Sequence, residues 1–306
     1  MRPINKRRWL VEHEGRIHAV KRGRSGRFHF ENMPRLHRIL AFFLRVTFTK
    51  WIGQVNALKV KLEQFDLACP SLPAAFDGLR ILLVADPHID NTDALVEKII
   101  KAVDSVAYDI CILGGDYTFG RAWKNAIDYS NLETIAKYLV SRSPVYGVLG
   151  NHDIYDVGEL LETIGVIMLV NDNAGIDRDG EKIYISGLDD CHYFGADDIK
   201  LTDESIEEGV FKIMVSHSPE TYKKAADAGY ALYFAGHTHA GQVCLPGQKA
   251  IVRGTSVPTR ILNGLWHHGK MTGYTSRGVG TSGIPVRFFC PPQIPLITLR
   301  SVPQIQ

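Results

Sequence analysis

The sequence lacks any stretch of 18 uncharged apolar residues, so we expect no helix that crosses a bilayer. It also lacks a secretory signal, because Val11–Arg16 carries two glutamates and a histidine where the apolar region of a signal would stand. The five cysteines are scattered and form no CxxC pair, which argues against a disulfide framework. From these absences we expect a cytoplasmic protein with reduced thiols.

Charge is distributed unevenly along the chain of 306 residues. The formal net charge is only +2, yet the first 50 residues contain thirteen Lys or Arg against three Glu, whereas the remainder has 22 basic and 30 acidic residues. A basic segment attracts phosphate-rich partners, either anionic lipid or nucleic acid. Because residues 1–34 are polar and aperiodic, we interpret them as a flexible basic arm. They contain no nucleic-acid-binding motif, so we expect no specific nucleic-acid partner.

Residues 35–72 form an amphipathic segment followed by a linker. Aromatic and aliphatic side chains between positions 36 and 52 are interleaved with Arg35, Arg38, Arg45 and Lys50. This pattern suits a helix that lies in a membrane interface, with apolar side chains in lipid and basic ones at the headgroups. A helix packed on the following domain fits the pattern equally well. An anionic membrane surface is therefore one expected partner, with the protein peripheral on the inner face of the cytoplasmic membrane, and the oligomeric state stays open.

Residues 73–306 alternate between short apolar runs and helical patterns, which predicts one catalytic α/β domain. Buried strands are expected at 80–85, 108–113, 145–149, 166–170, 182–187, 211–215 and 230–234, and helices near 93–106, 132–140, 157–164 and 220–228. Residues 173–180 are expected to turn between two of the strands. Short strands near 242–245, 271–276, 285–289 and 294–299 predict a closing β-rich segment. Alternating β and α followed by β alone favours a two-layered β core wrapped by helices.

Polar blocks directly follow five of these apolar runs. Because the carboxyl ends of parallel strands meet at one edge of an open sheet, we expect the polar side chains of these blocks to gather there. The blocks are Asp86-Pro87-His88, Gly114-Gly115-Asp116, Gly150-Asn151-His152-Asp153, Ser216-His217-Ser218 and Gly236-His237-Thr238-His239. The candidate ligands within them are Asp86, His88, Asp116, Asn151, His217, His237 and His239.

This set of donors predicts a metal centre. Four imidazoles and three oxygen ligands are too hard a set for a structural zinc site, which favours thiolates. Seven ligands are too many for one small ion, and they suit two ions held side by side with a bridging carboxylate. Two metals about 3.5–4 Å apart are a recurring device for hydrolysing phosphate esters. Mn, Fe, Zn and Co are all compatible with these ligands.

The order D-x-H, G-D, G-N-H-D, H, G-H-x-H over about residues 80–240 resembles the calcineurin-like metallophosphoesterases in all five blocks. The resemblance implies a four-layer α/β/β/α sandwich that follows the basic N-terminal extension. It implies that Asp86, His88 and His239 hold one metal, that Asn151, His217 and His237 hold the second, and that Asp116 bridges them. It further implies that His152 stabilises the transition state or protonates the leaving oxygen, with Asp153 as the residue that orients it.

The chain beyond residue 235 resembles one bacterial branch of that family. Gly236–Gln242, Ser276–Arg287 and Cys290-Pro291-Pro292 are similar to membrane-associated phosphodiesterases and to the chlamydial-type UDP-2,3-diacylglucosamine pyrophosphatase of lipid A synthesis, although Ala240 stands where that branch usually has Gly. The resemblance implies a dinuclear hydrolase of phosphodiester or pyrophosphate bonds, with a nucleotide-linked lipid as one candidate substrate and manganese as one candidate metal. The alternatives are a phosphomonoesterase or protein phosphatase and, in another class, a non-catalytic module on the same fold. No ligand position of the family pattern is missing.

Two further sets of residues have two readings each. Arg277 and Arg287 could bind the substrate by clamping a second phosphate, or they could be surface and packing residues. Asp189, Asp190 and His192 follow a predicted strand and could form a loop at the rim of the site or a solvated turn.

Overall fold

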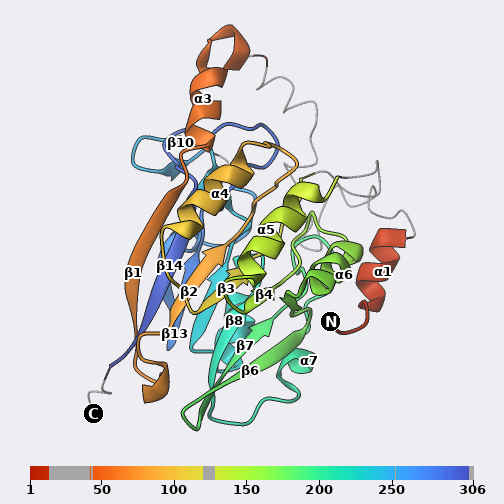
Figure 1. Cartoon of the computed structure of the whole chain (residues 1–306), viewed down its shortest axis with the longest axis vertical. Helices are drawn as coiled ribbons and strands as arrows, with labels where there is room; N and C mark the ends of the chain where they lie inside the picture. The colour runs from red at the N-terminus through yellow and green to blue at the C-terminus, as the bar shows by residue number, and fades with distance from the viewer. Residues whose placement is uncertain (14–41, 43, 120–127, 252, 303–306) are drawn as a thin grey trace.

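Two six-stranded sheets form the centre of the protein, and helices pack on their outer faces (Figure 1). The structure is a computed structural model that describes residues 1–13, 42, 44–119, 128–251 and 253–302. The predicted α/β fold with a two-layered β core is confirmed.

The first sheet has the strand order β1-β14-β2-β3-β4-β5. β14 pairs in parallel with β1 and antiparallel with β2, whereas β2 to β5 are parallel to one another. Its strands are β1 (Lys61–Cys69), β2 (Arg80–Val84), β3 (Ile110–Leu113), β4 (Val145–Gly147), β5 (Ile167–Met168) and β14 (Gln293–Ser301).

The second sheet has the order β12-β13-β9-β8-β7-β6. Its four central strands are parallel, and the two edge strands β12 and β6 run antiparallel to their neighbours. The strands are β6 (Asp172–Arg178), β7 (Glu181–Gly187), β8 (Phe211–Val215), β9 (Leu232–Ala235), β12 (Gly264–His268) and β13 (Met271–Thr275). A separate pair joins β10 (Cys244–Leu245) to β11 (Lys249–Ala250).

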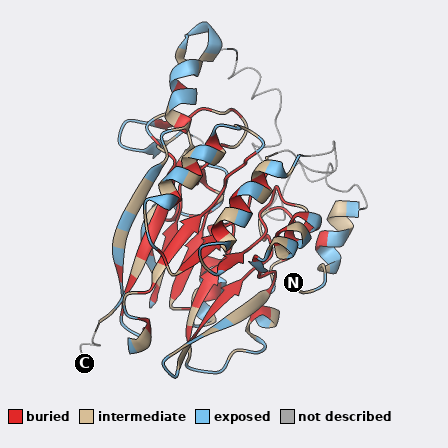
Figure 2. Ribbon diagram, in the orientation of Figure 1, coloured by how far each residue is buried: buried red, intermediate tan, exposed pale blue. Residues whose placement is uncertain are grey.

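The central strands are apolar on both faces because both faces are covered. In β2, Ile81 and Leu83 pack between the two sheets, whereas Leu82 and Val84 pack beneath the helices. This division follows from the alternation of side chains along a strand. Figure 2 shows that the strands at the centre of the molecule are almost wholly buried.

Three helices cover the outer face of the first sheet: α4 (Leu95–Asp104), α5 (Ser130–Val140) and α6 (Tyr155–Ile164). In α4 the buried residues Leu95, Ile99 and Val103 recur every four positions and form a single apolar stripe. On the second sheet, α8 (Tyr222–Asp227) packs near β12 and α7 (Ile199–Asp203) near β6. The predicted helices are therefore present, with ends that differ by a few residues.

Some strand predictions are wrong. Residues 172–178 form β6, which pairs with β7, and only Asp179-Gly180 turns between them. β6 is a half-exposed edge strand, so its polar sequence does not show the apolar pattern of a buried strand. Residues 285–289 form no regular strand and contribute one isolated bridge, Val243 to Phe288. β12 was not predicted.

β1 lies within residues 35–72, which the sequence predicted to precede the catalytic domain. In the structure, β1 pairs with β14 along nine residues, from Lys61 opposite Gln293 to Cys69 opposite Ser301. The first sheet therefore begins before residue 73.

The first thirteen residues differ from the flexible arm expected for residues 1–34. Lys6–His13 forms helix α1, which lies beside α6 (Figure 1). Arg8 in this helix is fully buried and paired with the buried carboxylate of Asp189. The partner of this arginine is an acidic residue from the later, acidic part of the chain. The composition of the sequence could not reveal this pairing. Residues 14–34 of the expected arm lie outside the described residues.

Helix α3 (Thr49–Ala57) projects from one end of the molecule (Figure 1). One face is packed: Gly53 and Ala57 are buried, and the carbonyl oxygen of Gly53 accepts a hydrogen bond from Arg287 N at 2.9 Å. The opposite face is exposed, with Phe48 86% and Trp51 71% accessible. The packed face agrees with the expectation of a helix that packs on the following domain. Within the described ranges, no helix is long and apolar enough to span a membrane.

Candidate metal centre

Five loops bring the predicted ligand side chains to one end of the two sheets. Three of the loops follow strands of the first sheet and two follow strands of the second, so the site lies where the sheets meet rather than at the edge of one sheet. Asp86 and His88 follow β2, Asp116 follows β3, Asn151 follows β4, His217 follows β8, and His237 and His239 follow β9.

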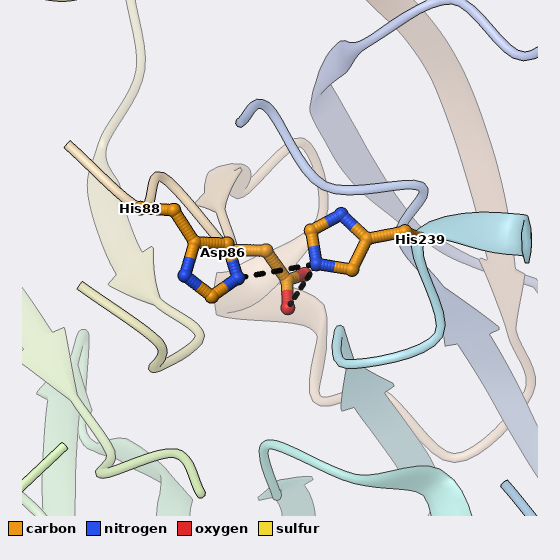
Figure 3. A group of neighbouring side chains, drawn as sticks. All are labelled: Asp86, His88 and His239. Atoms are coloured by element: carbon orange, nitrogen blue, oxygen red, sulfur yellow. Dashed lines mark hydrogen bonds and ion pairs between the residues drawn. The ribbon is translucent and has the colours of Figure 1, made fainter. Parts of the chain in front are cut away.

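Asp86, His88 and His239 form one group of side chains that could hold a metal ion (Figure 3). Nε2 of His239 lies 3.2 Å from Nε2 of His88 and 3.6 Å from Oδ1 of Asp86. Nδ1 of His88 lies 3.2 Å from the carbonyl oxygen of Thr118, so we assign the proton of this ring to Nδ1. Nε2 of His88 then directs its lone pair into the group, as a metal ligand would.

Asp116, His217 and His237 form a second group of the same kind. Asn151 lies with them: its Oδ1 is 2.8 Å from Nδ1 of His237 and 3.1 Å from Nε2 of His217. The structure therefore brings together all seven side chains that the sequence singled out, in the two sets that the resemblance implied.

The Asp116 carboxylate lies between the two groups. Its Oδ2 is 3.2 Å from Nε2 of His217 in the second group and 3.6 Å from Nε2 of His88 in the first. One carboxylate oxygen thus reaches a ligand nitrogen from each group, which is the placement expected of a bridging ligand.

The backbone around these residues is strained. Five of the seven side chains stand on residues with a left-handed backbone, a conformation that costs non-glycine residues of order 1–3 kcal/mol each and clusters at functional sites. Two glycines permit the close approach: a Cβ on Gly150 would lie 2.1 Å from Oδ1 of Asp116, and Gly278, at φ 72°, passes beside Asp86. The strained residues are Asp86 (φ 53°), His88 (φ 40°), Asp116 (φ 56°), His237 (φ 69°) and His239 (φ 46°).

The pKa values of the buried groups at this site are strongly shifted. Burial raises the pKa of Asp86 to about 7 and lowers the pKa of His88 to about 4. Burial alone would lower the pKa of His217, but the adjacent Asp116 outweighs it and raises that pKa to about 10. Burial also opposes ionisation of Asp116, yet His217 and His152 hold its pKa well below the ordinary value. Two buried carboxylates surrounded by imidazole nitrogens form a set of donors that fits divalent cations.

His152 lies beside the two groups rather than in either. Its ring is 5.2 Å from that of His88, its backbone N donates to Oδ1 of Asp116 at 2.9 Å, and its Nδ1 lies 3.1 Å from the carbonyl oxygen of Phe119. Asp153 was expected to orient His152, but the hydrogen bonds of its carboxylate go to other groups. The Asp153 carboxylate instead accepts hydrogen bonds from the backbone N–H groups of Asp116, Tyr117 and Gly150, and so ties two of the loops together.

The two arginines considered as phosphate clamps are engaged with protein groups. Arg277 pairs with Glu63 on β1 and donates to the carbonyl oxygen of Pro291. The fully buried Arg287 donates to the carbonyl oxygens of Gly278 and Gly280, and its Nη2 lies 3.3 Å from Nδ1 of His239. These contacts agree with the interpretation of the two arginines as packing residues. They also place the Arg287 guanidinium next to the ring of His239, which is a candidate metal ligand.

The structure adds residues that sequence reasoning left aside or missed. The ring of His192 lies 4.2 Å from that of His237, and its Nδ1 is 3.0 Å from Oε2 of Glu220. The buried Asp190 accepts hydrogen bonds from the backbone of Tyr193 and Phe194, so this segment is a structured loop at the rim of the site, not a solvated turn. Glu220 was missed, and its only sequence signal is its place three residues after His217.

Comparisons with known proteins agree with this geometry. The sequence pattern of the family described as calcineurin-like phosphoesterase matches residues 79–241. "Uncharacterized metallophosphoesterase YkuE" of Bacillus subtilis is 28% identical over 242 residues, which are 75% of this chain and 82% of that protein. "Phosphodiesterase YaeI" of Escherichia coli is 26% identical over 232 residues, 72% of this chain and 82% of that protein. "Transmembrane protein with metallophosphoesterase domain" of Danio rerio is 28% identical over 272 residues, 81% of this chain and 59% of that protein.

Proposed function

The chain belongs to the calcineurin-like phosphoesterase family, and from this premise we propose that it hydrolyses phosphodiester or pyrophosphate bonds in a nucleotide-linked lipid at an anionic membrane surface. Phosphoester hydrolysis at a dinuclear divalent metal centre follows from family membership and from the two groups of ligand side chains. The type of bond that is hydrolysed, the lipid substrate and the association with a membrane are the parts that we propose.

The position of Asp116 between two ligand groups carries the proposal. We assign Asp86, His88 and His239 to one ion, Asn151, His217 and His237 to the other, and Asp116 to both. When bound, two such ions supply charge neutralisation for the phosphate and an acidified water as nucleophile.

His152 is assigned to the leaving group. Its Nδ1 faces the carbonyl oxygen of Phe119, so Nε2 is the nitrogen through which it would deliver a proton to the departing oxygen. Phe119 also packs against the ring, with centroids 5.0 Å apart, and restricts its rotation. A proton donor of this kind matters most where the leaving group is a poor one, such as the alkoxide of a natural diester.

The membrane part of the proposal is supported by exposed apolar side chains next to the metal centre. Trp51 and Ile52 on α3 are exposed, as is Phe48 just before this helix. Phe289 and, on β10, Leu245 are exposed as well. The segments that carry them are hydrogen-bonded to one another, since Arg287 N donates to Gly53 of α3 and Cys244 N of β10 donates to Phe288. Arg287, whose backbone anchors α3, also lies behind His239. The apolar end of the molecule therefore adjoins the site.

Basic residues accompany this apolar surface. Arg45 and Lys59 are exposed on either side of α3, and Lys249 is exposed on β11. Exposed aromatic side chains with flanking basic residues suit an anionic lipid surface. We place the protein peripherally on the inner face of the cytoplasmic membrane, where UDP-2,3-diacylglucosamine is the candidate substrate.

A substrate comparison tests the proposal. Purified protein loaded with Mn²⁺ is assayed on bis-p-nitrophenyl phosphate, on p-nitrophenyl phosphate, and on UDP-2,3-diacylglucosamine in anionic vesicles with release of UMP as the readout. We expect turnover of the diester and of the lipid, with the Asp116→Asn variant as the inactive control. Preference for the monoester would favour a phosphomonoesterase instead, and diester turnover without UMP release would exclude the nucleotide-linked lipid.

A further inference from the structure

The N-terminal helix α1 contacts two loops beside the metal centre through one buried arginine. Nε of Arg8 donates to Oδ1 of Asp189 at 2.8 Å, and Nη2 lies 2.7 Å from the same oxygen. Nη1 donates to the carbonyl oxygen of Asp153 at 2.9 Å, and the guanidinium lies 4.0 Å over the ring of Phe194. One side chain thus joins two loops, the Gly150–Asp153 loop and the Asp189–Ala196 loop.

A second residue of α1 supports the first of these loops. Oε1 of Glu12 pairs with Nη1 of Arg8 at 3.0 Å and accepts a hydrogen bond from the backbone N of Tyr155 at 3.2 Å. Tyr155 is the first residue of α6, and Ile154 before it supplies no side-chain cap. Glu12 therefore satisfies an open N–H group of α6, a role that a residue at the start of the helix itself usually has.

Both loops carry side chains that line the metal centre. His152 stands one residue before Asp153, whose carbonyl oxygen Arg8 holds. His192 stands in the other loop, with its ring 4.2 Å from that of His237. The contacts of α1 continue around this loop: Nε of Arg7 donates to the carbonyl oxygen of Phe194 at 2.7 Å, and Val11 packs against Tyr193 and Phe194.

We propose that Arg8 is a positioning residue for the hydrolytic reaction, and that α1 is a clamp that holds the His152 loop and the His192 loop at the working distance from the metal centre. Neither Arg8 nor Glu12 touches the reacting atoms; each acts through the loop it holds. The inference concerns the family's hydrolytic reaction and does not depend on which phosphate ester is the natural substrate.

The choice of variant follows from the burial of Arg8. Removing the charge would leave the carboxylates of Asp189 and Glu12 buried beside each other, which destabilises a fold strongly. Arg8→Lys keeps the charge but loses the planar fork that reaches both loops at once. Glu12→Gln is a milder second variant, because the amide oxygen can still accept from Tyr155 N while its pairing with Arg8 weakens.

The principal experiment is a double-mutant cycle with His152. We expect Arg8→Lys to lower kcat by about 10- to 100-fold, with little change in KM, on a diester with a poor leaving group such as diphenyl phosphate, because a displacement of about 1 Å can cost about 100-fold in rate. In the His152→Ala background the same substitution should change kcat less than about 2-fold, since Arg8 acts through His152. A purely structural role would give the same loss in both backgrounds and would overturn the inference, as would an unchanged kcat or a loss of bound metal.

A readout without substrate accompanies the cycle. We expect faster amide hydrogen exchange in residues 150–155 and 189–196 of the Arg8→Lys and Glu12→Gln proteins. The matched control is Arg2→Met, which removes the half-exposed pair between Arg2 and Asp172 near α1 and should leave exchange and kcat as in the wild type. Unchanged exchange in both loops would refute the clamp even if the wild-type protein proved inactive on every diester, an outcome that would contradict the proposed function alone.

Discussion

The metal centre and the α3 end of the molecule lie next to each other. In both, the side chains depart from the usual distribution, in which polar groups are exposed and large apolar groups are buried, but the departures are opposite. At the metal centre, carboxylates and imidazoles are buried, with Asp86 and His88 wholly inaccessible. On α3, aromatic side chains are exposed instead, and Figure 2 shows that helix as mostly accessible. Buried polar groups and exposed large apolar groups are the two informative departures from an ordinary soluble surface.

The comparison teaches that the two regions suit different surroundings. Buried carboxylates require counter-charge, which divalent cations provide. Exposed aromatic side chains are compatible with the membrane interface that we propose for α3. Arg287 joins the two regions, because its backbone holds α3 and its side chain lies behind His239.

The largest effect on activity is expected at Asp116, the buried carboxylate that we assign to both ions. Asp116→Asn removes the carboxylate shared by the two ligand groups, so hydrolysis should fall by more than the about 10²–10⁴-fold that one proton-transfer group contributes. Metal content measured by mass spectrometry should fall with it. Asp109→Asn is the matched control, since Asp109 stands at the other end of β3 and contacts Arg80. Full metal occupancy with normal turnover in the Asp116 variant would rule out the shared ligand.

A smaller loss of activity should follow from His152→Ala. This substitution removes a buried side chain at the metal centre that we do not assign as a metal ligand. Both ions should stay bound while kcat falls by about 10²–10⁴-fold. If His152 protonates the leaving oxygen, the loss should shrink for esters with acidic leaving groups, and a series of aryl diesters measures this. His267→Ala, at an exposed position of β12, serves as the control. Loss of metal from the His152 variant would reassign the residue as a ligand.

At the apolar end, the paired substitution of Phe48 and Trp51 by Ser should weaken binding to anionic vesicles at least about tenfold. Burying one large apolar side chain stabilises by about 1.5–3 kcal/mol, and a tenfold change needs only about 1.4 kcal/mol. Flotation with vesicles at low and high salt measures it, and turnover of a soluble diester should be preserved. Leu265→Ser, an exposed apolar residue on β12, should bind vesicles as the wild type does. Equal flotation of the wild type and both variants would contradict the proposed contact between α3 and the membrane.

The smallest effect is expected at an ordinary surface, where polar side chains are exposed. Arg300 and Asp66 form an ion pair of 3.0 Å, and both are largely accessible. Arg300→Ala should lower the free energy of unfolding by less than about 1 kcal/mol, because solvent screens such pairs. Urea denaturation measures it. A loss of several kcal/mol would contradict the view that burial is what makes polar groups at the metal centre energetically different from exposed polar groups.

The sequence singled out the side chains that the structure brings together, because the pattern that marks them is local. Each candidate ligand follows an apolar strand directly, and the spacing within each block is independent of the rest of the fold. The two-sheet architecture was predicted on the same basis. The sequence did not reveal that both sheets contribute to the site, since the side-by-side placement of β4 and β8 loops depends on how the sheets pack.

Long-range contacts account for most of what the sequence could not predict. Arg8 stands in a basic segment that reads as a solvated arm, and its partner Asp189 lies 181 residues away. Asp153 was expected to orient His152 because the two are adjacent, but successive residues in a loop need not point the same way. Whether Arg277 meets a phosphate or Glu63 is likewise decided by β1, which lies 214 residues earlier in the chain.

The position of β14 between β1 and β2 has a consequence for synthesis on the ribosome. β14 separates β1 and β2 in the sheet, but it follows all the other strands of both sheets in the chain and is therefore made much later than β1 and β2. Until then, β2 lacks its β14 neighbour and has an open edge, and such edges promote aggregation. The complete first sheet therefore forms only after β14 has been synthesised.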